Sequence, residues 1–180
     1  MKKVIQCIFL STIIFSFSIQ VNAENEKPND PIKIQYESVG FTTPEKAIKE
    51  FQSLYQQKLN INEDTLNGIP FKITHRFGAF DKSIDQYLSL VYLNEQSKAM
   101  FKIMVFPKKN EIPLSKNELI DKLNNGIPFS YKKEQNFFIF RFKTENYAYI
   151  LSSNYLGENQ NMEKKFFIQM AEKITNTDQN

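Results

Sequence analysis

Strand-type runs in the second half of the chain come in pairs, and a short polar segment joins the two runs of each pair. Residues 87–93 and 98–106 form the first pair, and residues 137–143 and 147–153 form the second. Two such runs separated by a few turn-forming residues are typical of an antiparallel hairpin. The chain is therefore predicted to fold around an antiparallel sheet.

Other segments add strands to this sheet. Residues 32–38 alternate between apolar and polar side chains, and residues 71–77 place four ring or aliphatic side chains on one face. Residues 127–132 come directly after a predicted turn and are expected to form a further strand. A period of two is the pattern of a strand. Residues 87–93 and 137–140 are apolar at almost every position, so we expect them in central strands that are covered on both faces.

Three segments have the three- and four-residue apolar spacing of a helix: residues 44–58, 115–123 and 162–175. The first has the clearest start, because Thr43 is a favoured cap and Pro44 suits the first helical position. Strands in hairpin pairs with helices segregated between them indicate an α+β fold, with an antiparallel sheet of about five to seven strands and an N-terminal, a short middle and a C-terminal helix packed on it.

Aromatic residues are expected to hold this fold together. Phe138, Phe140 and Phe142 share one face of their strand, because side chains alternate along a strand. Helical spacing brings four apolar residues of the last helix onto one stripe. We predict that the stripe packs on the three phenylalanines; it consists of Phe166, Phe167, Met170 and Ile174.

The N-terminus has the pattern of a secretory signal peptide. Two lysines precede an apolar run from Val4 to Ile19, and Ala23 ends a segment suited to cleavage. We expect residues 1–23 to be removed and the mature chain to be secreted or extracytoplasmic, with no membrane span. The alternative is an uncleaved anchor, although the run is short for the roughly 20 residues that a bilayer requires.

The mature chain is expected to consist of a flexible leader (24–31), one α+β domain (32–176) and a disordered tail (177–180). Cys7 is the only cysteine and lies in the signal segment, so the domain forms no disulfide. After cleavage the chain contains 21 Lys and Arg residues and 20 Asp and Glu residues, because Lys2 and Lys3 are removed with the signal peptide. This balance argues against a nucleic-acid partner, which requires many phosphate contacts.

His75 is the only histidine and the one weak catalytic candidate. If the protein is a hydrolase that uses His75 as its base, a nucleophile and an orienting carboxylate must lie near this histidine. Ser83 or Ser89 is the candidate nucleophile, and Asp81 or Asp85 is the candidate carboxylate. No phosphate-binding loop or dinucleotide motif occurs, and a single histidine without cysteines gives no metal-ligand spacing. We therefore predict no cofactor and no metal site, and we regard an enzyme as the weaker alternative.

Aromatic surface is the remaining candidate, with Tyr87, Tyr131, Tyr147 and Tyr149 as weak binding residues, because tyrosine is favoured at interfaces. The preferred function is a secreted, non-enzymatic binding module for a protein or cell-envelope partner. Another alternative is an inhibitor or immunity protein that inserts the proline-containing loop 107–114 into its partner.

Two similar segments, residues 66–71 and 123–129, share the order Asn-Gly-Ile-Pro-Phe. They indicate either a duplicated helix-plus-strands unit or repeated use of one favourable turn. Asn-Gly tolerates a positive φ, and proline ends a strand ladder. The second explanation is preferred, because the strands that follow the two segments do not align.

Residues 69–78 with 90–94 resemble a group of small exported proteins of unknown function from Bacillus-like bacteria. Residues 147–153 and the helix that ends at Ile174 are similar to domains at the ends of some bacterial lipoproteins and membrane-tethered regulators. The resemblance implies an extracytoplasmic sheet-and-helix module without known enzymatic activity. The chain lacks a lipid-attachment cysteine after its apolar run and a separate regulatory domain.

Overall fold

The computed structural model describes residues 30–83, 86–108, 119–154 and 160–176. The chain divides into two units, residues 1–30 and residues 31–180, and the sheet belongs to the second. The predicted signal peptide and cleavage site, almost all of the leader, most of the loop 107–114 and the C-terminal tail lie outside the described residues.

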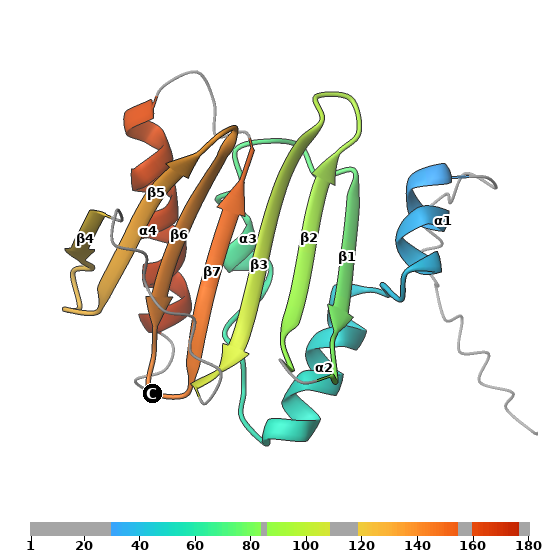
Figure 1. Cartoon of the computed structure of the whole chain (residues 1–180), viewed down its shortest axis with the longest axis horizontal. Coiled ribbons are helices and arrows are strands. Elements are labelled where there is room, and N and C mark those ends of the chain that lie inside the picture. Colours follow the sequence, from blue (N-terminus) through green and yellow to red (C-terminus); the bar gives the residue numbers. More distant parts are fainter. Residues whose placement is uncertain (1–29, 84–85, 109–118, 155–159, 177–180) are drawn as a thin grey trace, which may run out of the picture. The chain divides into compact units, whose positions relative to one another are not determined.

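The described elements are shown in Figure 1. In chain order they are α1 (Pro31–Ser38), α2 (Pro44–Tyr55), α3 (Glu63–Leu66), β1 (His75–Phe80), β2 (Leu88–Asn94), β3 (Ala99–Pro107), β4 (Leu119–Lys122), β5 (Pro128–Glu134), β6 (Phe137–Lys143), β7 (Tyr147–Ser153) and α4 (Gln160–Asn176).

The strands form one seven-stranded sheet in the order β1-β2-β3-β7-β6-β5-β4. Every neighbouring pair is antiparallel. Strands β1 to β3 form one meander and β4 to β7 form a second, and the two meet where β3 pairs with β7 (Figure 1). The predicted α+β class with an antiparallel sheet is confirmed.

The two faces of the sheet differ in what packs on them. Helices α2 and α4 lie behind the strands in Figure 1, α2 against β1 and β2 and α4 against β6. We call this side the helix face and the side toward the viewer the front face. Helix α1 contacts the front face at its edge, where Tyr36 stacks on Phe77 of β1 with ring centroids 4.3 Å apart.

The core lies between the helix face and α4 as predicted. Phe138, Phe140 and Phe142 are all buried, and Phe140 is fully enclosed. Its ring stacks on Phe167 of α4 at 5.6 Å and on Phe129 of β5 at 4.6 Å. The predicted packing of the last helix on the phenylalanine stripe of β6 is confirmed at Phe167, whereas Phe166 packs edge-on against Phe101 of β3.

Glycine at position 78 allows α2 to dock closely on β1. A Cβ atom there would lie 2.7 Å from the Cα of Pro44 and 2.8 Å from the Cβ of Ala47, both closer than such atoms approach. The predicted start of α2 is also confirmed, because the Thr43 side chain accepts a hydrogen bond from the amide of Lys46 at 3.3 Å. Helix α2 ends at Tyr55 rather than at residue 58, since Gln56 turns left-handed with φ of 53°.

The predicted strand at residues 32–38 is wrong, because Pro31–Ser38 is helix α1. Helical spacing also brings together Lys33 and Glu37, whose charged groups are 4.0 Å apart. The decisive contact is tertiary: Tyr36 packs between Phe41 and Phe77. Local alternation is a weak signal in so short a segment, and tertiary packing overrides it.

The predicted helix at residues 115–123 is also corrected. Residues 115–118 lie outside the described residues, and Leu119–Lys122 is the edge strand β4. Backbone hydrogen bonds between Leu123 and Ile127, and between Gly126 and Leu123, close a turn into β5. Gly126 has φ of 83°, so the Asn-Gly pair forms a hairpin turn and does not end a helix.

Further differences concern the strands. The run 71–77 becomes a strand only from His75, and the short helix α3 was not predicted. Strand β2 is buried on both faces as expected. Cover on both faces is wrong for β6, whose burial alternates along its whole length.

Candidate binding surface on the front face

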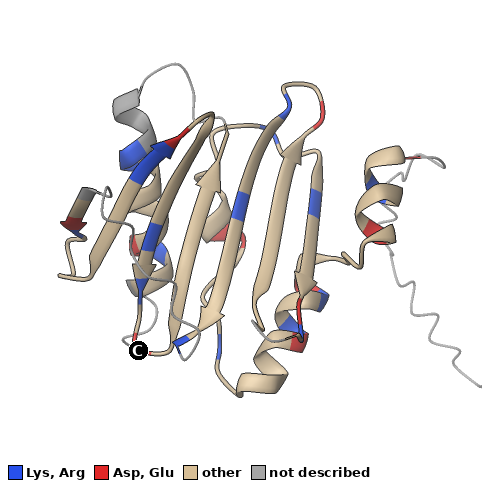
Figure 2. Cartoon of the chain, viewed as in Figure 1, with Lys and Arg blue, Asp and Glu red and all other residues tan. Residues whose placement is uncertain are grey.

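The front face carries an excess of basic side chains. By the strand registers, its described strand residues include five basic groups and one acidic group, Glu134. The basic residues are Lys102, Lys122, Lys132, Arg141 and Lys143. Figure 2 shows the basic segments on β3, β5 and β6. The Lys132 ammonium lies 2.8 Å from the Glu134 carboxylate, so the one acidic group among these described strand residues forms an ion pair with a basic neighbour.

Lys102 lies near the middle of this face among neighbours that are mostly apolar. Its register partners are Val91 of β2 and Ser152 of β7, and Met100 and Met104 flank it on β3. Burial lowers the pKa of the Lys102 ammonium. No ion pair joins Lys102 to a carboxylate within the described part of the chain. A cation in this position favours an external anion, because a partly desolvated charge is stabilised most by a close opposite charge.

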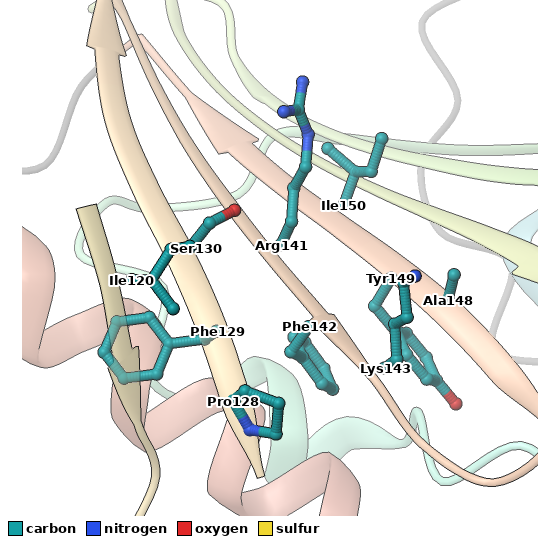
Figure 3. A pocket seen from close by; sticks show the side chains of 10 residues that line it. All are labelled: Ile120, Pro128, Phe129, Ser130, Arg141, Phe142, Lys143, Ala148, Tyr149 and Ile150. Carbon is teal, nitrogen blue, oxygen red and sulfur yellow. The ribbon is translucent and has the colours of Figure 1, made fainter. Parts of the chain in front are cut away.

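A cavity of about 150 Å³ lies on the front face between β4 and β7. Its apolar walls include Ile120 of β4, Pro128 of β5, and Ala148 and Ile150 of β7 (Figure 3). Ile120 is 62% exposed although it is a large aliphatic residue. The cavity therefore offers apolar surface at the rim as well as inside.

Four residues with polar groups also line this cavity: Ser130, Arg141, Lys143 and Tyr149, the last of which is one of the candidate tyrosines. Ser130 is 1% exposed, and its hydroxyl has no hydrogen-bond partner among the described residues. Ser130 and Arg141 are direct register partners on β5 and β6, and Figure 3 shows the serine oxygen turned toward the arginine side chain. A buried hydroxyl without a partner costs free energy, so its position beside a cation needs an explanation.

The residues proposed for a hydrolase are not assembled around His75. His75 is half-buried on β1, with Nδ1 2.8 Å from the hydroxyl of Thr74. By the β1–β2 register, Ser89 lies four residues further along the sheet, roughly 13 Å away at about 3.3 Å per residue. Asp81 accepts a hydrogen bond from the Ser83 amide in a turn beyond the other end of β1. Asp85 lies outside the described residues.

The four candidate tyrosines do not form one surface. Tyr147 and Tyr149 are buried on the helix face, where Tyr147 approaches the ring of Phe51. Tyr131 is half-buried against α4, on the same face. Tyr87 lies on the opposite side of the sheet, where it stacks on Phe106.

The residues that line the front face were missed in the sequence, although the signal was present. The alternation of residues 137–143 places Arg141 and Lys143 on the face opposite the phenylalanines. The same reasoning places Lys102 opposite the core residues of β3. A cation at alternate positions of an otherwise apolar strand therefore marks the second face of the sheet.

Comparison with known proteins gave no assignment: no family model, curated protein or solved structure matches the chain. Within the described residues, no group of three or more His, Cys, Asp or Glu side chains is placed to hold a metal ion. None of the described helices has the length and apolar character needed to cross a membrane. The site must therefore be interpreted from its own chemistry.

Proposed function

We propose that the chain is an exported, non-enzymatic binding module whose front face binds an acidic protein partner outside the cytoplasm. The observation that carries the proposal is the charge of this face, whose described strand residues include five basic groups and one acidic group, Glu134. Complementary charge steers association and selects partners. A partner with carboxylates on an apolar surface matches the chemistry of this face.

The position of Lys102 supports the same interpretation. Partial burial between Met100 and Met104 disfavours the charged form of Lys102 and lowers its pKa. A methionine there would pack well without that cost. The presence of a lysine at this position is explained if a carboxylate of the partner forms an ion pair with the Lys102 ammonium in the complex, where the pair would be shielded from water.

Site-specific photo-cross-linking in the producing cell tests the proposal. A benzophenone amino acid at Met104 reports on the front face, and the same amino acid at Lys49, an exposed residue of α2, reports on the opposite side. We expect a discrete protein adduct from position 104 and none from position 49. Lys102→Glu should abolish the adduct, whereas Lys46→Glu on the exposed side of α2 should leave it unchanged.

Three results would contradict the proposal. The first is no protein adduct at position 104, and the second is an adduct that persists in Lys102→Glu. The third is an adduct with lipid in place of protein, which would assign the basic face to a membrane surface. Circular dichroism of each purified variant confirms that the sheet is intact before the adducts are compared.

A further inference from the structure

We infer that the front-face cavity is a subsite for the C-terminal residue of the partner, with an aliphatic side chain inside the cavity and the terminal carboxylate bound by Ser130 and Arg141. This inference rests on the proposed function and names the part of the partner that is recognised. Capture of a terminal carboxylate is a recurring mode of peptide recognition.

The size of the cavity fits one side chain. At about 150 Å³ it matches an apolar cavity able to hold a ligand of the size of benzene. Ile120, Pro128 and Ile150 provide aliphatic walls. A leucine, isoleucine or methionine side chain fits this space, whereas a long acyl chain does not.

The polar groups at the cavity specify a carboxylate. Ser130 and Arg141 are opposed on adjacent antiparallel strands, so their Cβ atoms are about 4.5–5.5 Å apart, a spacing that allows one carboxylate to contact both side chains. The hydroxyl of Ser130 lacks a hydrogen-bond acceptor or donor in the described residues, and an anion would provide the acceptor. Lys143 adds a second positive charge on the same strand as Arg141.

A free carboxylate and an aliphatic side chain within one residue satisfy both parts of the site. An internal acidic residue would place its carboxylate at the end of its own side chain, and the aliphatic group would then come from a neighbouring residue. The adjacency of cavity and cations therefore favours a chain terminus.

The test uses small probes and methyl NMR on the full-length protein with labelled isoleucine. Ile120 and Ile150 report on the cavity, and Ile48 and Ile174 report on the helix side. N-acetyl-leucine mimics a C-terminal leucine, and N-acetyl-leucinamide is identical except that it lacks the charge. We expect saturable shifts at Ile120 and Ile150 with N-acetyl-leucine and at least fivefold weaker binding of the amide.

Variants define the two halves of the site. Arg141→Gln should remove the preference for the acid over the amide, while Lys122→Gln, a front-face residue that does not line the cavity, should retain it. Ala148→Leu should block both probes by filling the cavity. Ser152→Leu, on the same face of β7 but not among the residues that line the cavity, should bind the probes as the unmodified protein does.

Equal binding of acid and amide would overturn the inference, as would shifts spread over all four isoleucines. Hexanoate binding more than tenfold tighter than N-acetyl-leucine would also overturn it, because a fatty acid would then be the ligand. Loss of the subsite is distinguishable from loss of the proposed function. If cross-linking at Met104 persists while the probes fail, only the terminal-residue inference is wrong.

Discussion

Truncation of Phe140 gives the strongest test of the core. Its side chain is fully buried and stacks on Phe129 and Phe167, so the substitution Phe140→Ala removes a large apolar surface and four ring contacts, the other two being with Tyr131 and Phe142. Deletion of a buried phenylalanine costs about 3–5 kcal/mol. Because the ring is enclosed on both sides, we expect the upper part of this range, with a midpoint about 8–20 °C lower for a domain of this size.

Urea unfolding followed by circular dichroism measures the loss, with Phe137→Ala as the matched control. Phe137 is on the same strand but on the front face, where it is partly exposed. We expect its truncation to cost less than about 1.5 kcal/mol. Equal losses for the two variants, or a loss below about 2 kcal/mol for Phe140→Ala, would show that the phenylalanine stripe of β6 does not face the core.

Four further predictions follow from other features. Gly78→Ala should lower the free energy of unfolding by about 1–3 kcal/mol, because the new methyl group would clash with the backbone of α2. Gly68→Ala is the control: its new methyl group would lie 3.7 Å from the nearest atom, so its urea unfolding curve should almost match that of the unmodified protein. Lys102→Met should raise the melting midpoint at neutral pH, because it removes a charge that burial disfavours. The gain should shrink as the pH approaches 10.5. Burial lowers the pKa of Lys102 in the folded state, so the unmodified protein becomes more stable as rising pH removes the proton from the folded state first. A hydrogen bond from the Lys164 ammonium lowers the pKa of the Asp121 carboxyl, so Asp121→Asn should lower the midpoint at neutral pH. The difference from the unmodified protein should shrink as the pH falls through the lowered pKa and the carboxylate takes up its proton. N-terminal sequencing of exported protein should begin at Glu24, and intact Met1 on membrane-bound protein would contradict cleavage.

The strand pairs and the core were predictable because their signals are local and redundant. The boundaries of β6 and β7 match the prediction residue for residue, since turn chemistry and alternation agree there. The residues that form the last helix stripe were also recovered, and Phe167 packs as expected. In both cases the same residues carry the local pattern and the tertiary contact.

The segments at the margins of the domain were predicted less well because tertiary contacts decide them. Helix α1 depends on the stacking of Tyr36 on Phe77, a residue 41 positions away in the chain. Strand β4 is short and exists through its pairing with β5. The pairing of Ser130 with Arg141 could not be predicted for a related reason: the two residues become neighbours only through the β5–β6 register, which neither strand specifies by its own sequence.

The central pairing of β3 with β7 sets the order in which the molecule can form. Strand β3 ends at Pro107, and its neighbour β7 spans Tyr147–Ser153, so the middle of the sheet closes only after most of the chain is present. A chain that emerges from its N-terminus first would carry β3 as an unpaired edge until β7 arrives, and such edges are prone to pair with other chains. Early protection of that edge would therefore govern the yield of correctly folded molecules more than the final stability of the sheet does.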